Sequence, residues 1–162
     1  MEVCILHLGS NLGDPRHNLA LAEYLIAKRI GLIESKSKLY ATEPWGIEDQ
    51  NAFLNCAMKV NTMLSPDEVL AEISTIERKM GRIRQEKWGP RIIDIDIIFF
   101  GDQIIKNDNL IIPHPQLTNR NFVLFPLADI CPEYIHPELN KDVRTILSST
   151  TDRSKVEVIN EQ

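Results

Sequence analysis

The chain has 162 residues, of which 43% are apolar and 25% charged, as expected for one folded domain with a substantial core. Its formal net charge of −5 and pI near 5.4 argue against a nucleic-acid-binding protein, which normally carries excess positive charge. We expect no signal peptide and no membrane span, because no basic leader and no long apolar run occurs. Three widely spaced cysteines predict buried, reduced thiols of a cytoplasmic protein rather than a zinc site or disulfides.

The first third of the chain predicts a strand, a helix and a second strand. A short apolar strand covers 3–8 and is followed by a glycine-rich turn. Asp14 is a helix cap and Pro15 suits the first helical position, so we expect a helix over 15–28. Polar residues then alternate with apolar ones, which predicts a strand over 32–41.

The middle of the chain predicts a strand, a helix and a further strand. Residues 53–63 alternate like the preceding strand. Ser65 and Glu68 form a capping box, which predicts a helix from Pro66 to about Met80. A polar loop then leads into an isoleucine-rich strand that ends at Phe100.

The last third predicts shorter elements: a strand over 103–105, a helix over 121–130 that Pro126 interrupts, and a helix over 143–148. The main order is strand, helix, strand, strand, helix, strand, which is the split β-α-β arrangement. It predicts one domain over 1–162, of the α+β class, with a mostly antiparallel sheet and helices on its faces.

Two aspartates interrupt the isoleucine-rich strand. Asp94 and Asp96 are two residues apart, so both carboxylates leave the same face, while Ile93, Ile95 and Ile97 leave the other. Two carboxylates at this spacing repel each other unless a cation lies between them. Mg²⁺ commonly binds one or two carboxylates together with substrate phosphates. The pair therefore predicts a metal site, although an edge strand with a polar outer face would give the same pattern.

Nearby cations indicate the kind of substrate. Three arginines, Arg82, Arg84 and Arg91, lie close to the aspartates in the sequence. Arginine binds phosphate oxygens in pairs and keeps its charge, so the combination suggests a polyphosphate substrate. Any one of these arginines taken alone could equally be a solvated surface charge.

These residues together resemble a known family. The block Arg82-x-Arg84, Trp88-Gly89-Pro90-Arg91 and Asp94-x-Asp96-Ile97 is similar to the signature of 6-hydroxymethyl-7,8-dihydropterin pyrophosphokinase, also called 2-amino-4-hydroxy-6-hydroxymethyldihydropteridine diphosphokinase. The resemblance spans nearly the whole chain, through Leu8 to Leu12, Phe53 to Asn55, Pro113-His114 and Asn119-Arg120-x-Phe122. It implies a ferredoxin-like, three-layer α/β/α sandwich that transfers pyrophosphate from ATP to a reduced pterin in folate biosynthesis.

The resemblance also implies roles at the phosphate end of the site. Two Mg²⁺ ions would be held by Asp94 and Asp96, with ATP as co-substrate. Arg82 and Arg91 would act in catalysis beside the aspartates. The nucleotide would contact Glu77, Arg84, Arg91, Ile97, His114 and Arg120. His114 lies between two prolines and could instead be a structural loop histidine.

A pterin is flat with a polar edge, so its pocket needs aromatic faces and amide partners. Phe53 and Phe122 match the family positions that sandwich the ring, although both could be core residues. Trp88 could seal the pocket or anchor the start of the strand. The resemblance assigns the pterin to Thr42, Pro44, Trp45, Phe53, Asn55, Trp88, Asp94 and Phe122.

Two segments rich in glycine, proline and charge, 43–50 and 82–90, flank the expected site, and we expect them to close over it. Phe53, Trp45 and a shorter 82–88 loop depart from a familiar bacterial member. Two other functions stay open: a metal-dependent phosphotransferase with a different acceptor, and a non-catalytic nucleotide-binding module. We expect a monomer that acts on ATP and 6-hydroxymethyl-7,8-dihydropterin.

Overall fold

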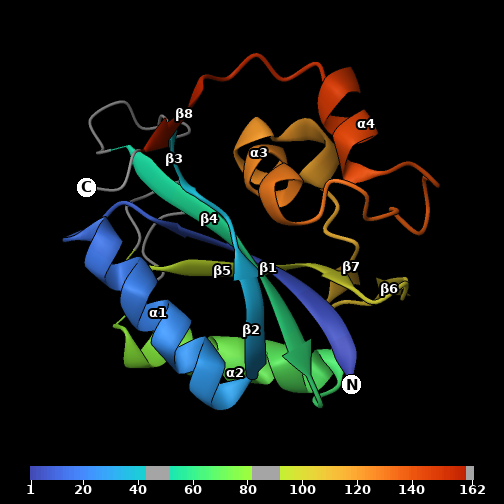
Figure 1. The fold of residues 1–162 in the computed structure, drawn as a ribbon. Coiled ribbons are helices and arrows are strands. Elements are labelled where there is room, and N and C mark those ends of the chain that lie inside the picture. Colours follow the sequence, from blue (N-terminus) through green and yellow to red (C-terminus); the bar gives the residue numbers. More distant parts are fainter. Residues whose placement is uncertain (43–51, 82–91, 160–162) are drawn as a thin grey trace.

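The computed structural model describes residues 1–42, 52–81 and 92–159, and Figure 1 shows their arrangement. The described residues in the first two thirds of the chain form five strands and two helices, and shorter elements follow. The elements are β1 (Glu2–Ser10), α1 (Pro15–Arg29), β2 (Gly31–Lys36), β3 (Leu39–Thr42), β4 (Phe53–Thr62), α2 (Pro66–Lys79), β5 (Asp94–Phe100), β6 (Ile105–Lys106), β7 (Ile111–Ile112), a 3-10 turn (Leu117–Asn119), α3 (Asn121–Ile130), α4 (Val143–Ser149) and β8 (Val156–Ile159).

One sheet organises these elements. Its strands follow the order β5-β1-β4-β3-β8, and β2 pairs with β4 beside β3. Every described pair in the sheet is antiparallel. The predicted α+β class and its mostly antiparallel sheet are confirmed, and the order of the main strands is that of a split β-α-β fold.

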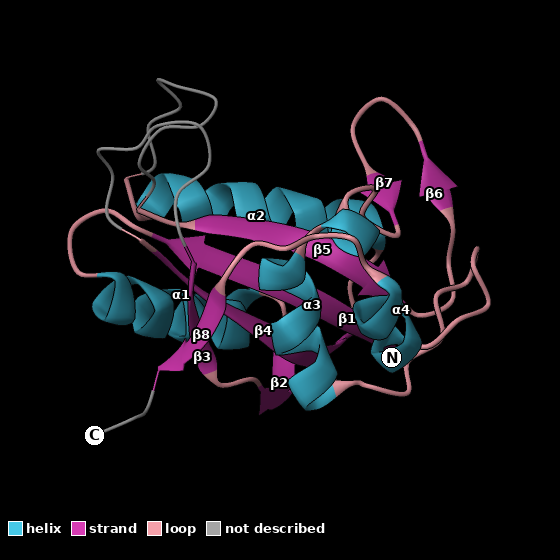
Figure 2. Ribbon diagram, turned by 90° about the horizontal axis from the view of Figure 1, so that it is seen from above, coloured by secondary structure: helices cyan, strands magenta, loops and turns pink. Residues whose placement is uncertain are grey.

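Helices cover both faces of the sheet, so the molecule has three layers (Figure 2). On one face α1 and α2 bury a cluster that includes Leu6, Leu8, Ile95 and Ile97. On the other face α3 and α4 bury a second cluster that includes Ile5. Successive residues of β1 therefore enter opposite cores, as the period-two alternation of a strand requires.

The predicted helix starts are confirmed by their hydrogen bonds. The Asp14 carboxylate accepts from the backbone N–H of His17 at 3.2 Å. Ser65 and Glu68 form the predicted capping box, with bonds of 3.2 and 3.1 Å. These local bonds satisfy N–H groups that have no partner within the helix, so they fix where α1 and α2 begin.

The prediction of one strand over 32–41 is wrong, because the chain forms β2 and β3 with a break at Ser37. The Ser37 hydroxyl accepts from the backbone N–H of Ala57 at 2.8 Å and donates to the Lys38 carbonyl at 2.7 Å. The Ser37 hydroxyl thus replaces a backbone carbonyl as the acceptor for the Ala57 N–H. This replacement interrupts the backbone hydrogen bonds between the strands locally.

The prediction that Pro126 interrupts the helix over 121–130 is also wrong, because α3 continues through it. The short strand expected at 103–105 lies further along, because Gly101 and Gln103 form a turn in which the Gln103 N–H donates to the Phe100 carbonyl at 3.0 Å. The strand is β6, and it pairs with β7.

The C-terminal segment forms a strand that the sequence pattern did not predict. Before β8, the Asp152 carboxylate accepts from the backbone N–H of Asn121 at 2.8 Å, and the Asn121 side-chain amide donates to the Asp152 carbonyl at 2.8 Å. β8 then pairs with β3, with Val156 opposite Thr42. The segment therefore connects the start of α3 to the edge of the sheet (Figure 1).

The three cysteines lie in the interior, as the sequence predicted. Cys4, Cys56 and Cys131 are free and buried, and burial raises the pKa of each thiol to about 12. None of the helices in the described part of the chain is both long enough and apolar enough to cross a membrane.

Glu77 attaches α2 to the edge strand β5. Its side chain is buried, and its carboxylate accepts from the backbone N–H of Ile95 at 3.2 Å. β5 is an edge strand of the sheet. The Glu77 carboxylate binds this strand at Ile95, the residue between Asp94 and Asp96. Glu77 thereby fixes the strand on which both aspartates lie.

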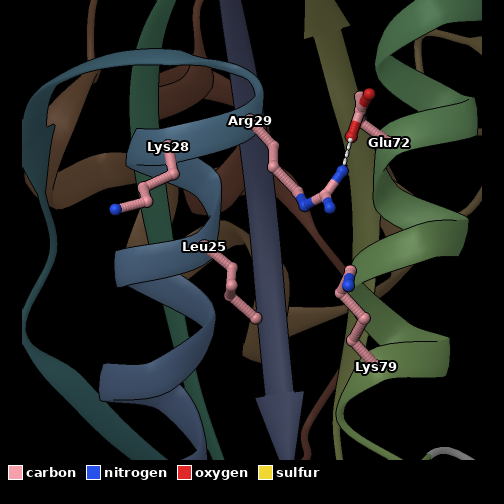
Figure 3. A pocket seen from close by; sticks show the side chains of 5 residues that line it. All are labelled: Leu25, Lys28, Arg29, Glu72 and Lys79. Carbon is pink, nitrogen blue, oxygen red and sulfur yellow. Dashed lines mark hydrogen bonds and ion pairs between the residues drawn. The ribbon is translucent and has the colours of Figure 1, made fainter.

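We predict that Glu77→Ala lowers the free energy of unfolding by about 1–3 kcal/mol, because it leaves a buried N–H without its acceptor. Urea denaturation would measure the loss. Glu72→Ala is the matched control, since Glu72 lies on the same helix and its 2.9 Å ion pair with Arg29 is one-third exposed (Figure 3). Such a pair contributes at most about 1 kcal/mol. Equal losses in both variants would contradict the role assigned to Glu77.

Candidate active site

The site residues lie on the sheet face that α3 covers, on both sides of β1. In the antiparallel register, His7 is opposite Asp96, and Gly9 is opposite both Asp94 and Asn55. Residues directly opposite each other share a face of the sheet. Three neighbouring strands therefore present these side chains to one area.

The two aspartates lie as the alternation predicted. Asp94 and Asp96 are partly buried, while Ile95 and Ile97 lie in the core on the α1 and α2 side. No group of three or more metal-binding side chains occurs within the described ranges. Two carboxylates on one face fit Mg²⁺, which takes its remaining oxygen ligands from water and phosphates.

His114 lies within electrostatic reach of Asp94 and Arg120. Burial and then the Arg120 charge lower its pKa to about 4, although Asp94 acts in the opposite direction. Nδ1 of His114 accepts from the backbone N–H of Gln116 at 3.1 Å. The neutral ring therefore carries its proton on Nε2, which makes Nε2 a hydrogen-bond donor. An N–H donor beside the Arg120 guanidinium suits an anionic ligand.

Phe122 is held from two directions at the start of α3. The guanidinium carbon of Arg120 is 5.5 Å from the centre of the Phe122 ring, a cation–π distance. The His7 ring lies 5.7 Å from it at an interplanar angle of 59°. Nε2 of His7 also lies 3.1 Å from the Phe122 carbonyl oxygen. His7 thus contacts both the ring and the backbone carbonyl of Phe122.

Thr42, Phe53 and Asn55 come together on β3 and β4. The Asn55 amide donates to the Thr42 hydroxyl at 2.9 Å, and both residues are buried. A Cβ atom at Gly9 would lie 3.1 Å from Asn55 Oδ1 and 3.7 Å from the Phe53 ring. The absence of a side chain at Gly9 therefore leaves space between the amide oxygen and the aromatic ring.

The two phenylalanines lie over neighbouring positions of β1. Phe122 contacts His7, and Phe53 lies beside Gly9. His7 and Gly9 are two residues apart on one strand face, which corresponds to about 7 Å. The two aromatic side chains therefore lie beside two successive positions on the same face of β1.

Two residues expected at the nucleotide, Glu77 on α2 and Ile97 on β5, have side chains that contact the protein interior. Glu77 reaches the strand from α2, and the Ile97 side chain lies in the core. A contact between Ile97 and a nucleotide would therefore use its backbone. A hollow of about 540 Å³ lies between α1 and α2 (Figure 3). These helices cover the sheet face opposite to the one on which Asp94 and Asp96 lie. The hollow is lined by Leu25, Lys28, Arg29, Glu72 and Lys79.

Six predicted site residues lie outside the described residues: Pro44, Trp45, Arg82, Arg84, Trp88 and Arg91. The same holds for the two segments expected to close over the site.

His7 is a site residue that the sequence pattern alone did not single out. It is 4% exposed, and burial lowers its pKa to about 4, partly offset by its bond to the Phe122 carbonyl and by Asp94. The available signal was a single polar ring in the middle of an otherwise apolar strand. Gly9, whose neighbours are Asn55 and Phe53, was named only within the segment Leu8 to Leu12 of the family resemblance.

Comparison with known proteins agrees with this geometry. The family model described as 7,8-dihydro-6-hydroxymethylpterin-pyrophosphokinase (HPPK) matches residues 5–132. The chain is 39% identical over 151 residues to the 2-amino-4-hydroxy-6-hydroxymethyldihydropteridine pyrophosphokinase of Aquifex aeolicus. That alignment covers 93% of this chain and 94% of the Aquifex protein. It is 42% identical over 159 residues to the folic acid synthesis protein FOL1 of Dictyostelium discoideum.

The length of the match differs between relatives. The alignment covers 98% of this chain but 23% of the Dictyostelium protein, so the chain spans less than a quarter of that relative. Among solved structures, HPPK-DHPS of Plasmodium falciparum with SDX-DHP is similar with a TM-score of 0.74 and 23% identity. That match covers 91% of this chain and 43% of the Plasmodium chain, and it shows the shared ferredoxin-like fold. The chain belongs to the 7,8-dihydro-6-hydroxymethylpterin-pyrophosphokinase family.

Proposed function

We propose that this chain transfers the pyrophosphoryl group of ATP to the hydroxyl of 6-hydroxymethyl-7,8-dihydropterin, releasing AMP, as a step of folate synthesis. Family membership supports the reaction. The observation that carries the proposal is one face of the sheet on which the Asp94 and Asp96 pair lies near Arg120, His114 and Phe122. Phosphate-binding groups and an aromatic ring meet there.

Asp94 and Asp96 would hold two Mg²⁺ ions, which would neutralise phosphate charge and lower the pKa of a bound hydroxyl. Arg120 would bind phosphate oxygens through its planar guanidinium, and His114 would donate its Nε2–H to another. These groups would align the β-phosphorus with the attacking hydroxyl, and positioning of this kind supplies much of the rate enhancement in phosphoryl transfer. Arg82, Arg84 and Arg91 are proposed to complete the cationic surround, with Glu77 and the Ile97 backbone at the nucleotide.

The pterin would lie between Phe53 and Phe122, with the Asn55 amide oxygen toward its donor edge. Thr42 supports that orientation, because its hydroxyl already accepts one N–H of the Asn55 amide. The same amide group then presents its oxygen toward the space beside Gly9. Pro44, Trp45 and Trp88 are proposed to enclose the ring further.

The proposal includes a monomer in the cytoplasm. Three buried, free thiols support a reducing compartment, where cysteines stay unpaired. Size-exclusion chromatography with light scattering at several protein concentrations would test the monomer, and a mass of twice 18.5 kDa would contradict it.

The decisive experiment incubates the chain with ATP, Mg²⁺ and the pterin and separates the nucleotides by chromatography. AMP should form only when the pterin is present, in equal amount to the pyrophosphorylated pterin. ADP formation, or AMP formation with a different acceptor, would indicate another phosphotransferase. Nucleotide binding without any turnover would indicate a binding module.

We predict that Asp94→Ala and Asp96→Ala each lower kcat at least about a hundredfold, because charge stabilisation at the reacting phosphates is lost. Both variants should keep a wild-type unfolding midpoint or exceed it, since one of two repelling carboxylates is gone. Asp102→Asn is the control, an exposed carboxylate just after the same strand. Near-wild-type turnover in either aspartate variant would refute the metal assignment.

Phe122→Ala should weaken pterin binding about tenfold, because the ring serves the pterin and a stacked pair contributes roughly 0.5–1.5 kcal/mol beyond area burial. Binding of a non-hydrolysable ATP analogue should change less than about twofold. Calorimetric titration of both ligands would measure this. Phe125→Ala is the control on the same helix, since Phe125 is 36% exposed and contacts the Tyr40 ring instead. Equal losses for pterin and nucleotide would mean that Phe122 only packs the core.

A further inference from the structure

The backbone of α3 lacks one of its own hydrogen bonds beside the site. In an α-helix the N–H of each residue donates to the carbonyl four residues earlier. Pro126 lies inside α3 and has no N–H, so the Phe122 carbonyl loses its usual helical donor. A partly buried carbonyl that lacks a donor is costly, so a donor from elsewhere stabilises the fold.

His7 supplies that donor from the centre of the sheet. Its Nε2 lies 3.1 Å from the Phe122 carbonyl oxygen, and a carbonyl can only accept, so Nε2 carries the proton and donates. The same imidazole lies 5.7 Å from the Phe122 ring. His7 therefore fixes the first turn of α3 through the backbone and the orientation of the aromatic ring through side-chain contact.

The position of His7 in the sheet connects this contact to the aspartates. His7 is directly opposite Asp96 across the β1 and β5 ladder. It therefore sets the location of Phe122 relative to the strand that carries both carboxylates. We propose that His7 is a positioning residue that aligns Phe122, and with it the pterin ring, with the phosphate end of the site. This inference rests on the proposed function.

The test compares three variants for pterin KM, ATP KM, kcat and urea unfolding. His7→Leu removes the donor, and we expect pterin KM to rise about tenfold while ATP KM changes less than about twofold. His7→Gln places an N–H near the original Nε2, so it should bring pterin KM to within about threefold of wild type.

The third variant combines His7→Leu with Pro126→Ala and separates positioning from simple stabilisation. The second substitution gives position 126 a backbone N–H, which can donate to the Phe122 carbonyl within the helix, so the unfolding midpoint should recover. Pterin KM should stay raised, because the restored bond lies within α3 and does not connect α3 to β1. Recovery of both quantities would mean that His7 only supplies the missing donor to the Phe122 carbonyl, and the inference would be wrong. The double variant also keeps the test valid if His7→Leu alone folds poorly.

Tyr40→Phe is the matched control. The Tyr40 hydroxyl donates to the Asp129 carboxylate at 2.8 Å, so it also connects the sheet to α3, but near the other end of the helix. This variant should lose stability without a change in pterin KM above about threefold. An equal rise of pterin KM in Tyr40→Phe and His7→Leu would overturn the inference. A wild-type chain that forms no pterin-dependent AMP would instead refute the proposed function on which the inference rests.

Discussion

The whole site depends on β1 being hydrogen-bonded on both sides, to β4 and to β5. This double pairing fixes the register of three strands at once. It therefore brings Asp94 and Asn55 to the two sides of Gly9, although they lie far apart in the sequence. A slip of one residue in either ladder would turn those side chains into the opposite core, where Leu8 and Ile95 lie. The hydrophobic pattern of the strands thus determines which face carries the chemistry.

Local sequence signals predicted the parts of the fold that local interactions determine. Capping residues such as Asp14 and Ser65 fix helix starts through bonds within a few residues, so their pattern is sufficient. The common face of Asp94 and Asp96 follows from strand periodicity alone, and their neighbours in space did not have to be known. The roles given to Arg91 and the other residues outside the described ranges stay predictions from family resemblance.

The errors and omissions concern interactions between distant residues. Ser37 ends β2 because its hydroxyl bonds to Ala57 on another strand, which nothing in the sequence around Ser37 indicates. Pro126 has no N–H to donate to the Phe122 carbonyl, but His7 on β1 hydrogen-bonds to that carbonyl, and α3 continues through the proline. β8 spans only the four residues Val156–Ile159, too short a stretch for its own pattern to predict a strand, and its strand character comes from pairing with the edge of β3. In each case the tertiary partner decides the local structure.

The connection of the C-terminal segment to β3 and α3 has a consequence for the order of folding. Thr42 pairs with Val156, and Asn121 bonds to Asp152, so the pterin side of the site joins strands from distant parts of the chain. Contacts between residues far apart in sequence form slowly, because a long loop must close before they gain any energy. Helices α1 and α2, with local caps, can form early. We therefore expect the pterin side, which joins Thr42 to Val156 and Asn121 to Asp152, to form later than the locally capped helices α1 and α2.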